Sequence, residues 1–163
     1  MGTRSMIAIQ VMDSKRIKSI YCHWDGYLQH NGSILNKHYQ DSPKVNQLIA
    51  NGDLSSLRPE IGVKHLFSSL EIKDKDERAA YEKSVEDMCT FYTRDRGEDA
   101  PFKSFANIKE AMDYYDGSWC EYFYLFKYTA QGEPRGWFYR TRENSRWKSV
   151  KTAIKKFKAE EVA

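Results

Sequence analysis

A short run near the N-terminus carries most of the side chains in this sequence that could do chemistry. Residues 20–27 read Ile-Tyr-Cys-His-Trp-Asp-Gly-Tyr, and His30-Asn-Gly32 follows soon after. Aromatic rings can stack on a flat ligand, while a histidine and a carboxylate supply hydrogen bonds. The predicted ligand or partner site consists of Tyr21, His23, Trp24, Asp25 and Tyr27. The alternative is a hairpin whose aromatic residues are core and whose Asp25-Gly26 step is a simple turn.

Metal binding and nucleophilic catalysis are two further interpretations of the same run. The metal-ligand types close in sequence are Cys22, His23, Asp25, His30 and His38. Adjacent Cys22 and His23 point to opposite faces of an extended strand, so they cannot chelate one ion together or pair as nucleophile and base. No hydrolase, phosphate-loop or dinucleotide motif accompanies them. We therefore predict no metal, no cofactor and no enzymatic activity.

Arginines in two other segments could extend this site. Arg94 and Arg96 bracket a carboxylate beside Gly97, an arrangement that can bind phosphate or carboxylate. Arg4 stands in a short polar context just before the first predicted strand. If Arg4 and Arg94 converge on Tyr21–Trp24, a nucleotide-like ligand is expected, with stacking by aromatics and anion binding by arginine. The alternative for the Arg94–Asp99 loop is a solvated segment with internal salt bridges.

The C-terminal region is basic and rich in aromatic residues. Between Arg135 and Lys158 there are nine lysines or arginines and one acidic residue, Glu143. Basic charge interleaved with aromatic rings is typical of surfaces that bind single-stranded nucleic acid or RNA. The candidate surface consists of Arg140, Arg142, Arg146, Trp147, Lys151 and Lys155. The alternative is an aromatic hairpin in the core followed by an amphipathic helix with a solvated lysine face.

The elements that would position these residues begin with a predicted hairpin, formed by 6–12 and 17–24 around a polar turn. Alternation puts Ile17, Ser19, Tyr21 and His23 on one strand face and Lys18, Ile20, Cys22 and Trp24 on the other, and both faces should be partly covered. A short helix is expected over 34–39. The next helix should begin at Asp41 or Ser42, with Pro43 in its first turn, and end before Gly52.

The remaining predictions give strands, helices and a second hairpin. They comprise a strand within 63–72, a charged helix over 74–86, a strand at 88–93, a polar loop at 94–99, a helix capped by Ser104, a hairpin of 121–128 with 136–140, and a helix over 149–159. Strand pairs separated by helices indicate a single α+β domain over 1–163, with a mainly antiparallel sheet built from hairpins and three to five helices packed on it. Its parts are 1–57, 63–100 and 104–160.

Composition narrows the class of protein. The sequence of 163 residues is 40% hydrophobic and 14% aromatic, which is enough to build a core and too much for disorder. Its formal net charge of +3 is too small to indicate nucleic-acid binding by itself. Three widely spaced cysteines form neither a disulfide framework nor a CxxC pair, which favours a reducing cytosol. No signal-peptide or membrane-spanning run is found, so we expect no membrane partner.

Several of these segments resemble a family of small uncharacterised proteins encoded by tailed bacteriophages. The matching motifs are Gly2-Thr-Arg-Ser5, Ile20-Tyr-Cys-His-Trp-Asp-Gly-Tyr27, His30-Asn-Gly32, Gly52-Asp-Leu-Ser-Ser-Leu57 and Arg94-Asp-Arg-Gly-Glu98. The resemblance covers most of the chain. It implies a viral accessory protein that acts in the host cytoplasm and lends no catalytic residue.

Two mechanisms suit a small accessory protein without enzymatic motifs. It could inhibit a host-defence or transcription protein by covering it, or sequester a nucleotide second messenger between aromatic rings and arginines, which suits a homo-oligomer. The expected function is therefore a non-enzymatic host-defence antagonist. The alternative is a nucleic-acid-binding regulatory protein that uses the basic aromatic C-terminal region.

Overall fold

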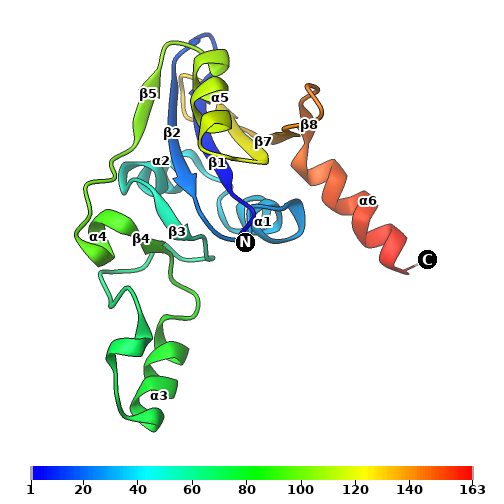
Figure 1. The fold of residues 1–163 in the computed structure, drawn as a ribbon. Helices are drawn as coiled ribbons and strands as arrows, with labels where there is room; N and C mark the ends of the chain where they lie inside the picture. Colours follow the sequence, from blue (N-terminus) through cyan, green and yellow to red (C-terminus); the bar gives the residue numbers. More distant parts are fainter. Residues whose placement is uncertain (1, 163) are drawn as a thin grey trace.

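The computed structural model describes residues 2–162, and the side chains through residue 159. An eight-stranded sheet forms its centre, with the strand order β4-β3-β2-β1-β6-β7-β8 and with β5 beside β2 (Figure 1). The strands are β1 (Ser5–Val11), β2 (Ile17–Cys22), β3 (Leu54–Ser56), β4 (Thr90–Phe91), β5 (Lys103–Phe105), β6 (Tyr122–Tyr128), β7 (Pro134–Thr141) and β8 (Lys148–Ser149).

Most of this sheet is antiparallel. Five of the seven strand pairings run antiparallel, and only β1 with β6 and β2 with β3 are parallel. The two predicted hairpins are confirmed as β1–β2 and β6–β7. They lie side by side because β1 pairs with β6 along its whole length. The α+β class with a largely antiparallel sheet is confirmed.

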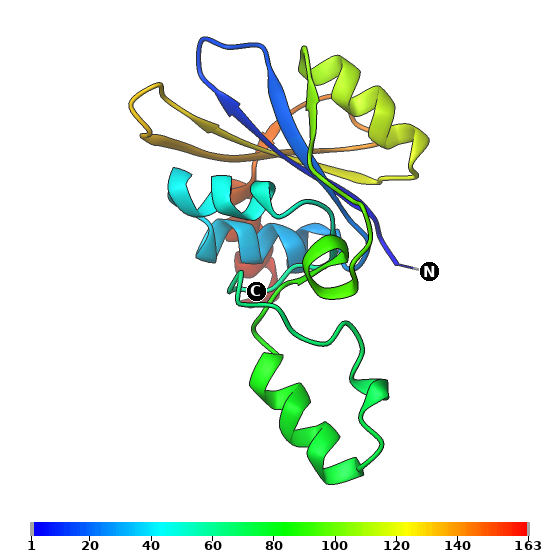
Figure 2. The same ribbon diagram turned by 90° about the vertical axis from the view of Figure 1, so that its left-hand side faces the viewer.

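Helices cover both faces of the sheet. In Figure 2, α5 lies on one face, while α1, α2 and α6 lie on the other. The helical segments are η1 (Leu28–Gly32, a π-helix), α1 (Ser33–His38), α2 (Ser42–Ala50), η2 (Ser69–Glu71, a 3-10 turn), α3 (Lys75–Val85), α4 (Tyr92–Arg96), α5 (Ile108–Gly117) and α6 (Val150–Val162). The described residues thus contain six α-helices, of which α3 projects away from the sheet (Figure 1).

Two hydrophobic clusters fill the space between these layers. The larger one lies between the sheet and the helices α1, α2 and α6, and includes Ile20 and Cys22 of β2. The smaller one lies under α5 and includes Ile17, with Tyr21 packed against it. Residues that alternate along β2 therefore enter opposite cores, as the sequence pattern indicated. A strand that is covered on both faces has a fixed register, because a shift by one residue would move each side chain into the opposite core.

The start of α2 follows the prediction closely. Asp41 accepts a hydrogen bond from the Lys44 backbone N–H at 2.8 Å, which satisfies one of the unpaired donors of the first turn. Pro43 occupies the first turn, where its missing N–H costs nothing. This helix places Val45, Leu48 and Ile49 in the larger core.

The segment between β3 and β4 departs from the prediction. The strand predicted within 63–72 is wrong, since this stretch holds bends and the 3-10 turn η2. Its backbone donors bind side chains instead of a neighbouring strand: His65 N–H donates to Asp95 at 3.1 Å, and Leu66 N–H donates to the Tyr81 hydroxyl at 2.6 Å. With α3, the segment extends away from the sheet (Figures 1 and 2).

Two boundaries nearby also need correction. The strand predicted at 88–93 is limited to Thr90–Phe91, because the Asp95 carboxylate accepts the Phe91 N–H at 2.8 Å and α4 begins at Tyr92. The predicted loop at 94–99 therefore begins as helix and ends it at Gly97, which has a φ of 78°.

A helix boundary after β5 was also predicted wrongly. Ser104 lies in β5 and does not cap α5. Asn107 is the cap, accepting a hydrogen bond from the Glu110 N–H at 3.0 Å. Within the described residues, no helix combines the length and the apolar character needed to cross a membrane.

Candidate ligand-binding site

The N-terminal residues lie against the loop that follows β2. Gly26 donates its backbone N–H to the carbonyl oxygen of Thr3 at 2.7 Å. A Cβ on Gly26 would lie 2.8 Å from that carbonyl oxygen, and a Cβ on Gly2 would lie 2.5 Å from the Trp24 ring. Both glycines therefore permit a close approach that a side chain would block. This contact brings together two of the motifs that are separated in the sequence.

Strand pairing then places four polar side chains in a row across one end of the sheet. The last residues that pair at this end are Cys22 on β2, Ser5 on β1, Tyr122 on β6 and Thr141 on β7. The adjacent residue on each chain forms the row, which reads His23, Arg4, Glu121 and Arg142. Backbone hydrogen bonds continue the register, since Glu121 N–H donates to Arg4 and Arg142 N–H donates to Glu121, both at 2.9 Å.

This row faces the same side of the sheet as α5. Met6 and Phe123 lie two residues along from Arg4 and Glu121, and both belong to the core under α5. Because side chains alternate along a strand, Arg4 and Glu121 point to that side as well. Within the row, Glu121 and Arg142 are exposed and Arg4 and His23 are partly exposed.

Arg4 and Trp119 line two adjoining pockets at this place. One, of about 330 Å³, is bounded by Arg4, Tyr21, Asp53, Lys103, Tyr114, Tyr115, Ser118 and Trp119. The other, of about 320 Å³, is bounded by Gly2, Arg4, Trp119, Glu121 and Arg142. Each volume is at the lower end of the range of small-molecule sites, roughly 300–1,000 Å³. Together the walls combine three cationic side chains with exposed aromatic surface.

Trp119 has an unusual backbone conformation. Its φ is +64°, in the left-handed region that bulky residues avoid. It follows α5 in a Schellman arrangement: Cys120 N–H donates to Tyr115 and Trp119 N–H donates to Asp116, each at 3.1 Å. Glycine is the usual residue at that position. A tryptophan there, 66% exposed, is strained without any compensating burial.

Tyr21 and His23 form a hydrogen-bonded pair beside Arg4. The Tyr21 hydroxyl lies 2.8 Å from His23 Nδ1. Burial raises the pKa of Tyr21 to about 12, so its hydroxyl stays protonated at neutral pH. Burial, and then the Arg4 guanidinium, lower the pKa of His23. A neutral imidazole next to a guanidinium leaves that guanidinium available for an anion.

Asp53 occupies the opposite wall of the larger pocket. Its carboxylate accepts the Tyr21 backbone N–H at 2.9 Å. Burial raises the pKa of Asp53, and this effect is opposed by the hydrogen bond from Tyr21 and by Lys103. Lys103 in turn lies over the Tyr114 ring, 5.4 Å from its centroid. This wall therefore presents a partly buried carboxyl beside a cation held on an aromatic face.

The remaining residues of the predicted aromatic run lie on the loop that follows β2. Trp24 is 45% exposed and meets His23 edge to face, with ring centroids 4.6 Å apart. Asp25 has a φ of 57° and lies 4.0 Å from His30, while Tyr27 is exposed and packs loosely on the same histidine. The structure therefore brings Tyr21 and His23 next to Arg4, with Trp24 against His23, whereas Asp25 and Tyr27 lie farther along the loop.

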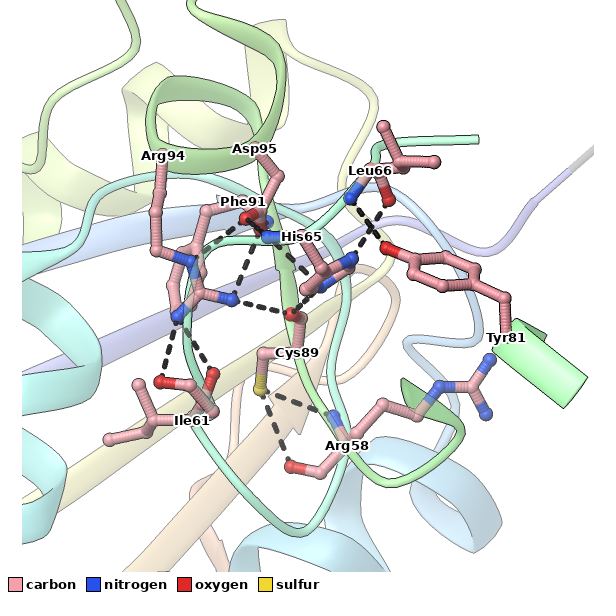
Figure 3. Close-up of polar contacts among 10 residues, drawn as sticks. Arg58, Ile61, His65, Leu66, Tyr81, Cys89, Phe91, Arg94 and Asp95 are labelled. Atoms are coloured by element: carbon pink, nitrogen blue, oxygen red, sulfur yellow. Dashed lines mark hydrogen bonds and ion pairs between the residues drawn. The ribbon is translucent and has the colours of Figure 1, made fainter. Parts of the chain in front are cut away.

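Arg94 lies in a different part of the molecule and is fully engaged there (Figure 3). Its guanidinium donates to the carbonyl oxygens of Ile61, Gly62 and Cys89 and to both carboxylate oxygens of Asp95, at 2.9–3.2 Å. The Asp95 side chain is fully buried. These contacts fasten the projecting segment to α4, so the geometry gives Arg94 a structural role. Arg96 is half exposed and pairs with Glu98 at 2.9 Å.

The basic C-terminal residues divide between the two faces of the sheet. Arg140 and Arg142 line a cavity against α5, and Trp147 packs against the core on that side. Lys151 and Lys155 are exposed on α6, whose Val150 and Ile154 belong to the other core. Arg146 is exposed before β8. The six residues predicted as one nucleic-acid surface are therefore not on one face.

Cys22 is separated from His23 as the strand geometry requires. Its thiol is completely buried in the larger core near Asn31, and burial raises its pKa to about 12. The side chain of His23 points to the other face, toward Tyr21. Among the described residues, no three histidine, cysteine or acidic side chains lie close enough to hold a metal ion.

The sequence pattern did not identify several residues of the site, chiefly Asp53, Lys103, Tyr114 and Trp119. Asp53 lies in the Gly52–Leu57 segment, whose turn-like sequence gave no sign that its carboxylate would bind the Tyr21 backbone N–H. Trp119 follows the helix end at Gly117–Ser118, but nothing in its neighbours indicates a positive φ. Comparison with protein-family models, curated proteins and solved structures finds no match to this chain.

Proposed function

We propose that this protein is a non-enzymatic binding protein that holds a nucleotide between Arg4 and Trp119. The observation that carries the proposal is the placement of an exposed tryptophan, strained at a glycine position, over pockets that also contain Arg4. Backbone strain of this kind costs stability, and it persists most often where a function needs it. An exposed indole and a guanidinium are the groups that stack on a base and bind a phosphate.

The surrounding charges suit an anionic ligand. Arg4, Lys103 and Arg142 face two carboxyl groups, Asp53 and Glu121. Burial raises the pKa of Asp53, and its carboxylate is already engaged by the Tyr21 backbone N–H. Arg142 is also held in place by Asp116 at 2.8 Å and lies 5.5 Å from the Trp119 ring centroid. A phosphate at Arg4 would therefore meet fixed cations and the edge of a stacking surface.

The side chains of this site favour binding of a ligand over its chemical conversion. Two potential nucleophiles in this region are Tyr21, which lines the larger pocket, and Cys120, which follows Trp119, and burial raises the pKa of each to about 12. At neutral pH both are protonated and poorly nucleophilic. The Tyr21 hydroxyl is further occupied by His23. A bound ligand would thus be retained unchanged.

With the resemblance to bacteriophage proteins, this site supports an antagonist of host defence in the host cytoplasm. In this proposal the protein sequesters a nucleotide signal and so withholds it from the host. A protein-binding inhibitor is the second candidate, and the exposure of three aromatic residues, Trp24, Tyr27 and Trp119, is the observation that favours it. Tyrosine and tryptophan are enriched at such interfaces.

Binding measured by calorimetry tests the proposal. A panel of mononucleotides and dinucleotides is titrated into the protein and into the Arg4→Ala and Trp119→Gly variants. Both variants should lose at least tenfold in affinity, the amount expected from one charge-assisted contact or one base stack of about 1.5 kcal/mol or more. Arg16→Ala removes an exposed arginine in the β1–β2 turn and serves as the matched control.

Ligand recovery separates sequestration from turnover. After heat denaturation the nucleotide should be released intact, and a modified product would contradict the non-enzymatic proposal. If no nucleotide binds while Trp119→Gly abolishes capture of a host protein, the inhibitor candidate replaces it.

A further inference from the structure

Arg140 has a buried donor without an acceptor. Among the side-chain atoms that the structure describes, its Nε is the one buried nitrogen or oxygen that makes no hydrogen bond. Buried polar groups in folded proteins are nearly always paired, because an unpaired donor loses its bond to water. Arg140 also makes no salt bridge within the described residues, so no carboxylate there neutralises its charge.

A cavity of about 290 Å³ lies in front of this side chain, between α5 and β7. Its walls include the apolar residues Ile108, Met112 and Phe123. The two carboxylates on its rim are already engaged, because Asp113 pairs with Lys109 at 3.1 Å and Asp116 pairs with Arg142 at 2.8 Å. The cavity therefore offers an unpaired guanidinium beside a surface that suits a flat ring.

The ring of Trp147 supports the Arg140 guanidinium. Its guanidinium carbon lies 5.8 Å from the centroid of the Trp147 ring, and that ring packs against the core under α5. A guanidinium held on an aromatic face loses little freedom on binding an anion. Arg140 is in this respect similar to Arg142, which lies over Trp119 at 5.5 Å.

The cavity continues into the site described above. Arg142 lines both this cavity and the pocket shared by Arg4 and Trp119. Arg140 is two residues from Arg142 on the same face of β7, about 7 Å along the strand. Arg4 is two strands away from Arg142, at roughly 10 Å. The three arginines thus follow one surface, with Trp119 beside Arg4 and Arg142 and the apolar cavity beside Arg140.

We propose that the ligand is a dinucleotide, with one phosphate at Arg4 and the second at Arg140. One base stacks on Trp119, and the other enters the cavity formed by Ile108, Met112 and Phe123. This inference rests on the proposed function and deepens it, because a mononucleotide would leave the Arg140 cavity empty. The carboxylate of Glu121, between Arg4 and Arg142, favours two separate phosphates over one compact polyphosphate.

Calorimetry with mononucleotides and dinucleotides tests the inference. The probes are AMP, GMP, CMP, UMP and ATP, together with linear 5′-phosphorylated and cyclic dinucleotides of the same bases. At least one dinucleotide should bind tenfold or more tightly than any mononucleotide. Arg140→Gln should remove this advantage and leave mononucleotide affinity unchanged. Arg140→Lys keeps the charge without the Nε donor, so it should retain part of the advantage if the glutamine variant fails to fold.

The outcomes separate this inference from the proposed function. If ATP or a mononucleotide binds as tightly as every dinucleotide, the second subsite is excluded while the proposed function stands. Equal losses for mononucleotide and dinucleotide in Arg140→Gln also exclude it. Absence of binding to all probes would overturn the proposed function and the inference with it.

A longer probe identifies the source of the dinucleotide unit. A single-stranded decanucleotide that binds no more tightly than the dinucleotide indicates a free dinucleotide. Tighter binding that weakens steeply with salt indicates a segment of single-stranded nucleic acid, because each further phosphate contact releases counterions.

Discussion

The carboxylate of Asp53 occupies a gap in the sheet beside Tyr21. It accepts the Tyr21 N–H at 2.9 Å, between Ser19, which β5 pairs, and Cys22, which β3 pairs. A side chain thus replaces a missing strand partner. Asp53→Ala should lower the free energy of unfolding by about 1–3 kcal/mol, because a buried donor loses its acceptor.

Asp53→Asn is the matched variant for this bond. Its amide oxygen can still accept the Tyr21 N–H, so the loss measured by urea unfolding should be well below that of the alanine variant. Equal losses for the two would show that the carboxylate charge, and not the hydrogen bond, matters at this position.

Trp119→Gly should separate stability from binding. Relief of the left-handed conformation is worth about 1–2 kcal/mol, while the exposed contact with Arg142 contributes about 0.5–1 kcal/mol. We therefore expect the free energy of unfolding to be unchanged or raised by up to about 1 kcal/mol, whereas nucleotide affinity falls. A variant that is clearly destabilised would show that the tryptophan has a structural role.

Arg94 should be among the most sensitive positions for folding. Replacing it with alanine leaves Asp95 buried beside the remaining donors of His65 and Phe91, without its cation (Figure 3). Removing one partner of a buried pair costs roughly 3–5 kcal/mol. Urea unfolding should show this loss for Arg94→Ala, with faster proteolysis between residues 58 and 89.

Arg96→Ala is the control for that measurement. Arg96 and Glu98 are both about half exposed, so their pair should contribute less than about 1 kcal/mol. Similar losses in the two variants would contradict the structural role of Arg94.

The sequence predicted the local pattern of this fold better than its long-range contacts. Alternation along β2 identified two covered faces, and Asp41 with Pro43 identified the start of α2. The segment at 63–72 was mistaken for a strand because its apolar residues suit one, whereas Asp95 and Tyr81 bind its backbone from distant positions. Local propensity contains no information on such partners.

In the candidate site too, residues that are local in the sequence were predicted and those brought in by long-range contacts were not. Tyr21, His23 and Arg4 were proposed as site residues from their residue types, and pairing of β1 with β2 brings them together. Asp53, Lys103 and Trp119 join them through contacts that span the chain. Arg94 was grouped with Arg4 because arginine beside glycine suits anions, but its partners are the neighbouring Asp95 carboxylate and backbone carbonyl groups that no sequence pattern marks.

The proximity of Arg4 to His23 can be tested by titration of the imidazole. Burial and the Arg4 guanidinium both lower the pKa of His23 below 6.5. The stability that neutral His23 contributes is therefore present above about pH 6.5 and is lost as the pH falls through the lowered value. Arg4→Ala should raise the pKa of His23 toward 6.5, because one of the two causes is removed.

A bound phosphate should act in the opposite direction to Arg4. An anion beside His23 favours the imidazolium and raises its pKa, so affinity for a phosphodiester ligand should increase as the pH falls from about 7 to 5. NMR of the imidazole protons gives the pKa directly, and His23→Gln assigns the signal among the four histidines. If the His23 pKa is the same in the free protein, in Arg4→Ala and with ligand bound, then neither the guanidinium nor the phosphate lies beside this ring.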